Sequence, residues 1–103
     1  MDPREEAVLR RVPSGLFVAG RWRPATGGGT FPVEDPSTAR VIAEVADAGP
    51  ADAGAALDAA VGAQREWAHT PPRDRGEILR RAFEVLVART EDLALLMTLE
   101  MGK

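Results

Sequence analysis

The stretch RVIAEVADAGPADAGAALDAAVGAQREWAHT, Arg40 to Thr70, decides the fold class because the spacing of its apolar residues changes halfway along. In Arg40–Val45, apolar and polar residues alternate, which is typical of a half-buried strand. The face that we expect to be half-buried carries Val41, Ala43 and Val45. Across Ala53–Trp67 the apolar residues recur at helical spacing, and Asp52 lies where it complements the helix dipole. The stretch therefore predicts a strand followed by an amphipathic helix.

Short extended segments precede this stretch. Leu16–Val18 and Arg21–Arg23 flank the turn Ala19-Gly20, which predicts a tight hairpin. Thr30–Glu34 is a third extended run, and the proline inside it restricts that run to a sheet edge or a bulge. Asp35–Thr38 has the composition of a turn, because its proline presets φ and its Asp and Ser satisfy nearby backbone donors. We expect a small peripheral sheet.

Helical segments are expected at both ends of the chain. Asp2 is a candidate N-cap of a first helix, which we expect to be a frayed arm. Beyond the helix Ala53–Trp67, another helix is expected from Pro72, and Thr90 is a candidate N-cap of the helix that follows it. Gly102 suits a helix C-cap. The apolar side of the last two helices carries Ile78, Leu79, Ala82, Phe83, Leu86, Leu93, Leu96 and Met97.

The predicted fold class is α/β, or α+β for the chain as an isolated piece, with short peripheral strands followed by two to three amphipathic helices. We expect an N-terminal arm at residues 1–14 and an incomplete domain at residues 15–103. Much of the 45% hydrophobic content is alanine, and two Trp and three Phe are the only aromatic anchors. We therefore expect a thin core, because alanine buries little area.

The composition excludes several classes of function. The 13 basic and 16 acidic residues are spread along the chain, so no basic stripe is available for nucleic acid or anionic lipid. The chain has no cysteine, which removes disulfides, thiolate metal sites and thiol nucleophiles. No run approaches the ~20 apolar residues of a membrane span. We expect a soluble, cytoplasmic protein that binds neither nucleic acid nor membrane.

Few residues are suited to chemistry. Gly27-Gly28-Gly29 precedes an extended run, whereas a dinucleotide phosphate loop needs its glycines before a helix. His69 is the only histidine, so it cannot form a dedicated zinc set, and we expect it in a surface loop. Ser14 and Ser37 lack the flanking glycines of a nucleophile elbow. These residues are better interpreted as turn and loop residues.

The charged residues also give little support to a catalytic or DNA-binding function. The pairs Glu34-Asp35 and Glu91-Asp92 flank a turn and a helix start, and adjacent carboxylates rarely converge on one substrate atom. The helix expected from Pro72 carries arginines, as a DNA-reading helix would, but acidic residues are interleaved with them. These residues are Arg73, Arg75, Arg80 and Arg81, with Asp74, Glu77 and Glu84. We assign no residue as catalytic, cofactor-binding or metal-binding.

Five motifs nevertheless occur in order along the chain. They are LFVAGRW at Leu16–Trp22, DPST at Asp35–Thr38, the helix Ala53–Trp67, PRDRGEILRR at Pro72–Arg81 and TLEMGK at Thr98–Lys103. Together they resemble the beginning of the NAD(P)-dependent aldehyde dehydrogenase superfamily, and the succinate-semialdehyde branch is the most similar. Two departures are Asp35 in place of the usual Asn, and Ala39 in place of the usual Gly, of the turn.

The resemblance implies oxidation of a small aldehyde to a carboxylate with NAD or NADP, by a homo-oligomeric protein several times longer than this chain. It also implies that the catalytic cysteine, the general-base glutamate, the oxyanion-hole asparagine and the cofactor-binding lysine lie beyond Lys103. We therefore expect an inactive N-terminal fragment that binds no cofactor alone and self-associates through its exposed apolar helix faces. Two alternatives remain open, a small non-catalytic helical module that binds a protein partner, and a DNA-binding protein.

Overall fold

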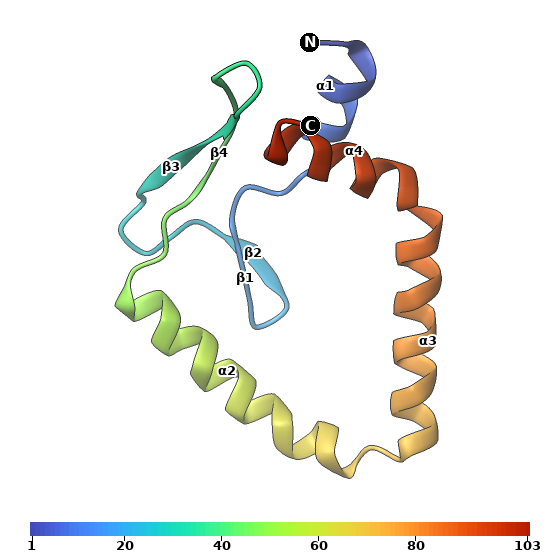
Figure 1. Cartoon of the computed structure of the whole chain (residues 1–103). Helices are drawn as coiled ribbons and strands as arrows, with labels where there is room; N and C mark the ends of the chain where they lie inside the picture. Colours follow the sequence, from blue (N-terminus) through green and yellow to red (C-terminus); the bar gives the residue numbers. More distant parts are fainter.

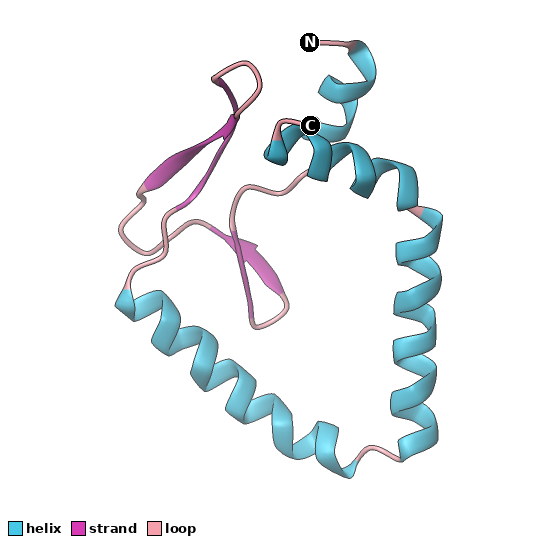
Figure 2. Ribbon diagram, in the orientation of Figure 1, coloured by secondary structure: helices cyan, strands magenta, loops and turns pink.

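The computed structural model describes residues 1–103 as four helices and four short strands (Figure 1, Figure 2). In chain order the elements are α1 (Pro3–Arg10), β1 (Leu16–Val18), β2 (Arg21–Arg23), β3 (Thr30–Asp35), β4 (Arg40–Ala46), α2 (Pro50–His69), α3 (Pro72–Ala88) and α4 (Thr90–Met101). The strands form two separate antiparallel hairpins, β1 with β2 and β3 with β4. The predicted order of short strands followed by helices is confirmed.

The β1–β2 hairpin turns through Ala19 and Gly20, which both have positive φ, at 53° and 78°. Two consecutive positive φ values match the right-handed twist of the flanking strands. Phe17 lies opposite Trp22 in this hairpin, with ring centroids 5.0 Å apart, and both side chains are more than half exposed. The predicted hairpin is confirmed, and its aromatic pair lies at the surface.

The β3–β4 hairpin contains a bulge on β4. Val33 pairs with Ala43 and Glu34 pairs with Val41, so Ile42 has no partner in the ladder. An extra residue in one strand moves the side chains before it to the opposite face. Val41 is therefore 53% exposed, whereas Ile42 and Ala43 are half-buried. The prediction that Val41 shares a half-buried face with Ala43 is wrong for this reason.

Helix α1 is capped and packed against α4. The Asp2 carboxylate accepts hydrogen bonds from two backbone N–H groups of the first turn, at 2.6 and 3.4 Å. Glu5 reaches back to accept from the Asp2 N–H at 3.0 Å, which completes a capping box. Val8 is buried, and Arg11 forms an ion pair with Asp92 of α4 at 2.8 Å. The prediction of a frayed arm is wrong, because a helix remote in sequence covers α1.

Helix α2 is longer at both ends than its apolar pattern predicts. At its start, Asp52 accepts a hydrogen bond from the Gly49 N–H at 3.0 Å, which fixes the first turn. At its end, His69 lies in the last turn, with Nδ1 2.8 Å from the Arg65 carbonyl oxygen. The prediction that His69 lies in a loop is wrong, although the residue is exposed as expected.

Of the two caps predicted for α4, the C-cap at Gly102 forms and the N-cap at Thr90 does not. Thr90 does not cap the helix, because its hydroxyl donates to the Val87 carbonyl of α3 at 2.7 Å. One residue separates α3 from α4, so the hydroxyl meets a free carbonyl of the preceding helix first. Gly102 has φ 73° and donates to the Thr98 carbonyl at 2.9 Å. The predicted C-cap is therefore confirmed.

The molecule is an open, flat frame. Helices α2, α3 and α4 form three of its sides, and α4 brings the chain back beside α1 and β3 (Figure 1). The Cα radius of gyration is 16.9 Å, against about 13 Å for a compact chain of this length. The accessible surface is 7862 Å², whereas a compact protein of this mass exposes roughly 5,600 Å². The frame therefore exposes surfaces that a compact domain would bury.

The buried residues are few and scattered, and they are Val8, Ala25, Asp35, Asp52 and Leu99. Helix α3 has no buried residue, and its apolar side is open, with Leu79 64% and Phe83 63% exposed. The thin core expected from the composition is confirmed. None of the four helices has both the length and the apolar character that crossing a membrane requires.

Ala39 in the β3–β4 turn gives a first test. Its φ of 58° is left-handed, which costs an L-residue roughly 1–2 kcal/mol and costs glycine nothing. Ala39→Gly should therefore stabilise the turn by about 1 kcal/mol, or roughly fivefold. The residue 39 N–H donates to the Asp35 carbonyl at 2.8 Å, so its amide exchange, corrected for the intrinsic rate, should slow by that factor.

The matched control is Ala55→Gly at an exposed position of α2, where the backbone is helical and glycine is unfavourable. Exchange in α2 should accelerate in that variant. Unchanged or faster exchange at residue 39 in Ala39→Gly would contradict the left-handed turn.

Candidate functional site

The most extensively bonded side chain is Asp52, in the first turn of α2. Its Oδ1 accepts from the Thr26 hydroxyl at 2.6 Å and from an Arg23 guanidinium N–H at 2.9 Å. The carboxylate also accepts from the backbone N–H of Thr26, at 3.1 Å, and of Gly49, at 3.0 Å. The Asp52 side chain is 2% exposed. One carboxylate therefore joins β2, the β2–β3 connection and the start of α2.

The donors around Asp52 favour its charged form. The hydroxyl of Thr26 and then the backbone N–H of Gly49 lower the pKa of Asp52 far below its usual range, against the opposing effect of burial, and Arg23 lowers it further. A general base must be able to take up a proton near the working pH. Asp52 is therefore suited to holding segments together and unsuited to proton transfer.

The sequence predicted only a dipole contact for Asp52. Its partners Thr26 and Arg23 are 26 and 29 residues away in the chain, so no local pattern identifies them. The one available signal is the Gly-Pro-Ala-Asp start of the helix, which places a carboxylate at a capping position.

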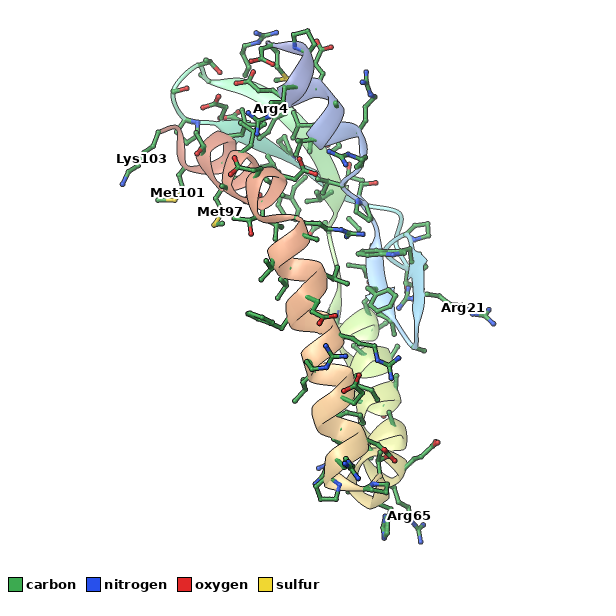
Figure 3. All side chains as sticks on the ribbon, turned by 90° about the vertical axis from the view of Figure 1, so that its right-hand side faces the viewer. Arg4, Arg21, Arg65, Met97, Met101 and Lys103 are labelled. Atoms are coloured by element: carbon green, nitrogen blue, oxygen red, sulfur yellow. The ribbon has the colours of Figure 1, made fainter.

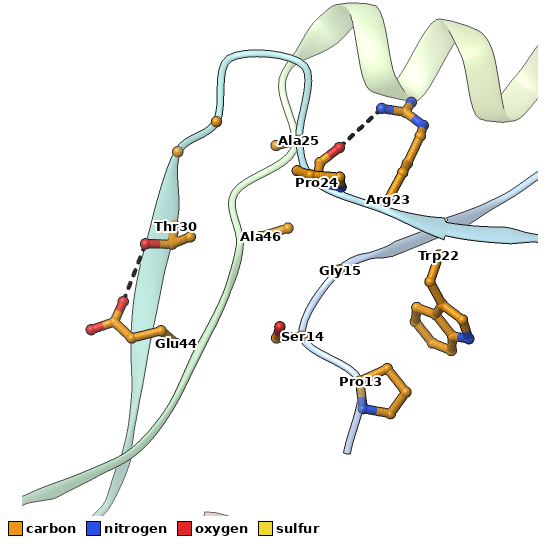
Figure 4. A pocket seen from close by; sticks show the side chains of 12 residues that line it. Pro13, Ser14, Gly15, Trp22, Arg23, Pro24, Ala25, Thr30, Glu44 and Ala46 are labelled. Atoms are coloured by element: carbon orange, nitrogen blue, oxygen red, sulfur yellow. Dashed lines mark hydrogen bonds between the residues drawn. The ribbon is translucent and has the colours of Figure 1, made fainter. Parts of the chain in front are cut away.

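A groove of about 380 Å³ lies between the two hairpins (Figure 4). Within the β3–β4 hairpin Thr30 donates to Glu44 at 3.2 Å, and on the other side of the groove Arg23 donates to the carbonyl of Pro24 at 3.1 Å. Glu44 is the only carboxylate among the lining residues, and it is exposed. The groove therefore lacks the paired acid and base in contrasting environments that hydrolytic or proton-transfer chemistry needs.

The segment Gly27-Gly28-Gly29 connects β2 to β3. Gly28 has φ 73° and donates to the Ala25 carbonyl at 2.8 Å, which makes a tight turn. Dinucleotide phosphates bind where successive backbone N–H groups point outward at the start of a helix. Because this segment leads into a strand, it does not fit a dinucleotide phosphate.

The other candidate residues lie in separate turns and caps. The Ser37 hydroxyl donates to the Asp35 carboxylate at 2.7 Å, inside the β3–β4 turn. The Ser14 carbonyl accepts from the Ala46 N–H at 2.8 Å. Glu91 and Asp92 form ion pairs with residues at either end of α1. No three His, Asp or Glu side chains are placed to share a metal ion.

Two arginines of α3, Arg80 and Arg81, are paired with acidic residues of the same helix. Arg80 forms hydrogen-bonded ion pairs with Glu77, at 2.6 Å, and with Glu84. The Arg80 guanidinium lowers the pKa of Glu77, and that contact in turn raises the pKa of Arg80. In Figure 3, Arg65 lies at the far end of the frame and Arg21 projects from the β1–β2 hairpin. The predicted mixture of charges along α3 is confirmed.

The hydrogen bonds around Asp52, the Asp52 tie, lead to a prediction about stability at acidic pH. Its folded-state pKa is lowered, so its contribution to stability is complete above the unfolded-state pKa, about 3.9, and is lost as the pH falls below it. The N–H groups of Thr26 and Gly49 should therefore lose exchange protection on acidification. Asp52→Asn should start with weaker protection at these two amides and show a flatter pH dependence.

Asp58→Asn is the matched control, because Asp58 is exposed on the same helix. That variant should keep the pH dependence of the parent chain. If Asp52→Asn behaves in the same way as Asp58→Asn at the Thr26 and Gly49 amides, the tie is not formed in solution.

Comparison with known proteins identifies relatives over most of the chain. The model of the aldehyde dehydrogenase family matches residues 22–103. A succinate-semialdehyde dehydrogenase of Paenarthrobacter nicotinovorans is 62% identical over 63 residues, 61% of this chain and 14% of that protein. The mitochondrial succinate-semialdehyde dehydrogenase of Homo sapiens is 39% identical over 97 residues, 94% of this chain and 17% of that protein. The chain thus spans less than a fifth of these relatives.

The fold has a close counterpart among solved structures. The crystal structure of HpcC from Thermus thermophilus superimposes with a TM-score of 0.90 and 32% identity. The match covers 97% of this chain and 20% of that one, so both hairpins and all four helices are included. Family match, sequence identity and backbone similarity agree, and the chain belongs to the aldehyde dehydrogenase family.

Proposed function

We propose that this chain is the amino-terminal scaffold segment of an aldehyde dehydrogenase that oxidises succinate semialdehyde to the corresponding carboxylate. The observation that carries the choice of substrate is the 62% identity to the Paenarthrobacter nicotinovorans protein. The backbone alone does not single out a substrate, because HpcC superimposes well at 32% identity. The substrate proposal therefore rests on sequence, and the scaffold proposal rests on the fold and its surfaces.

The exposed side of α3 supports the scaffold role. Its apolar residues Ile78, Leu79, Phe83 and Leu86 are 46 to 64% exposed. Monomeric proteins rarely leave a contiguous apolar surface of this kind open to water. The matched residues make up 14% and 17% of the two curated relatives, so most of each of those proteins lies outside the matched part. In our proposal, that additional protein covers α3.

The proposal assigns the cofactor to other parts of the protein. NAD or NADP is the cofactor that the family implies, but the glycine segment 27–29 leads into a strand and does not fit its phosphates. Asp52 is committed to internal donors, and Glu44 has no acid or base partner in the groove. In our proposal these residues hold the frame together and take no part in the chemical steps.

A second candidate function is a helical module that binds a protein partner, and the same exposed face of α3 favours it. The two functions differ in what the isolated chain should do on heating. A scaffold segment without its covering protein should unfold over a broad range, whereas an independent module should show one cooperative transition. Calorimetry of the isolated chain, with analytical ultracentrifugation to detect self-association through the helix faces, distinguishes them.

Several sequence-based expectations stay predictions. They are the absence of catalytic, cofactor-binding and metal-binding residues, the absence of nucleic-acid and membrane partners, the cytoplasmic location and the homo-oligomeric state of the whole protein. The boundary between an arm at residues 1–14 and a domain from residue 15 is also a prediction.

The whole protein provides the test of substrate. We expect the reading frame to continue past Lys103 and to supply a glycine-rich strand–helix turn and, later, a cysteine. The purified product should oxidise succinate semialdehyde with a kcat/KM at least about tenfold above that for butanal, because a site built for a carboxylate leaves its polar groups unpaired on an uncharged aldehyde. The isolated 103-residue chain, as a control, should form no NADH or NADPH.

Two outcomes of that assay would contradict the proposed function. Equal kcat/KM for the two aldehydes would remove the substrate proposal, and aldehyde-dependent turnover by the isolated chain would remove the scaffold proposal.

A chimeric enzyme tests the scaffold role separately. In the Paenarthrobacter nicotinovorans protein, the 63 matching residues are replaced by those of this chain. A scaffold segment should leave kcat/KM within about one order of magnitude of the parent enzyme, because it contributes no group to the transition state. Deletion of the same 63 residues is the control and should yield insoluble or inactive protein. A soluble chimera without activity would contradict a purely structural role.

A further inference from the structure

The end of α4 lies very close to the β3–β4 turn. A Cβ atom added at Gly102 would be 2.8 Å from the Ser37 backbone nitrogen and 3.1 and 3.2 Å from two carbons of Pro36. Real Cβ atoms essentially never approach a backbone nitrogen at 2.8 Å, so only glycine fits at this position. Leu99, one turn earlier in α4, is buried at the same end of the helix. The helix therefore meets the turn by direct backbone contact.

The turn that receives Gly102 is held by its own hydrogen bonds. The Asp35 carboxylate accepts from both the N–H and the hydroxyl of Ser37, at 2.8 and 2.7 Å. The Asp35 carbonyl accepts from the N–H groups of Thr38 and Ala39, at 3.2 and 2.8 Å. Because these hydrogen bonds all lie within the turn, they fix its shape, and Ser37 cannot shift locally to make room for a side chain at position 102 without breaking them.

Gly102 also occupies the place in the frame where the chain returns on itself. The Asp52 carboxylate anchors the start of α2 to the β2–β3 connection. From there α2 and α3 lead away, and α3 has no buried residue to fix its position. At the beginning of α4, Arg11 holds Asp92, but this ion pair is exposed and exposed pairs contribute little. Together with the packing of α4 against β3 and α1, the contact at Gly102 joins the far end of the three helices back to the strands (Figure 1).

We propose that the contact between Gly102 and the turn Asp35–Ala39, which we call the joint, closes the frame. The joint sets the angle of α4, and through α4 that of α3, relative to the two hairpins. In this way the joint fixes the direction in which the apolar faces of α3 and α4 point, before any other protein covers them. This inference concerns the chain itself and does not rest on the proposed function.

The test compares two glycines that have the same φ. Gly28 and Gly102 both have φ 73°, but a Cβ at Gly28 would meet nothing within 4 Å. Alanine at either position carries the strain of a positive φ, so the additional effect that we expect of Gly102→Ala comes from the contact with the turn. The Ser37 amide should lose about tenfold of its exchange protection in Gly102→Ala, as expected for an overpacking substitution, and keep it in Gly28→Ala.

Distance measurements then show whether the frame opens. The chain has no cysteine, so spin labels attach only at introduced sites. With labels at Asp47→Cys beside the strands and Met97→Cys on α4, Gly28→Ala should keep a single narrow distance distribution. Gly102→Ala should broaden the distribution and add longer distances. Identical distributions for the two variants would overturn the proposal.

A measurement on the parent chain covers the case in which Gly102→Ala fails to fold. The Gly102 Cα hydrogen that points toward Ser37 should give a nuclear Overhauser effect to the Ser37 amide hydrogen, because a Cβ in its place would be 2.8 Å from the Ser37 nitrogen. Its absence from the spectrum of the unsubstituted chain would overturn the joint regardless of the variants.

Discussion

The frame depends on one buried carboxylate. Asp52 accepts hydrogen bonds from a side chain of β2, from the backbone and hydroxyl of the β2–β3 connection and from the residue before α2. These hydrogen bonds help to set the direction in which α2 leaves the strands, and α3 and α4 follow α2 in the chain. A buried carboxylate is favourable only when its donors are all in place. The structure leaves no buried side-chain polar atom without a partner, which satisfies that condition.

The chain reverses the usual division between core and surface. In an ordinary domain, apolar burial supplies stability and polar contacts refine the geometry. Here the ordering contacts are polar or backbone contacts at Asp52, Asp35 and Gly102, while the largest apolar side chains of α2 and α3 face solvent. In the proposed scaffold role, this arrangement leaves the apolar surface available for burial against the rest of a larger protein.

The sequence predicted those features that depend on neighbouring residues. The hairpin around Ala19-Gly20, the cap at Asp2 and the C-cap at Gly102 each need only a few consecutive residues, and each is confirmed. The misses depend on distant partners. A strand pattern cannot show that Ile42 is bulged, because the bulge is defined by pairing with β3.

The same reason explains the errors at the helices and at the site. Helix α1 was expected to fray because its cover, α4, is about eighty residues away in the sequence. Thr90 was expected to cap α4, but the end of α3 competes for its hydroxyl. Asp52 was placed correctly at a helix start, yet its role follows from Thr26 and Arg23, which only the folded chain brings to it.

The exposed aromatic residues have a practical consequence. Trp22, in a tilted contact with Phe17 on the first hairpin, is 56% exposed, and Trp67 near the end of α2 is 41% exposed. They are the only two tryptophans, and the chain has no tyrosine to add to the emission. Any protein that covers the hairpin or the outer part of α2 must take an indole ring out of water. The chain thus carries its own optical reporter, whose emission moves to shorter wavelength when either surface is covered.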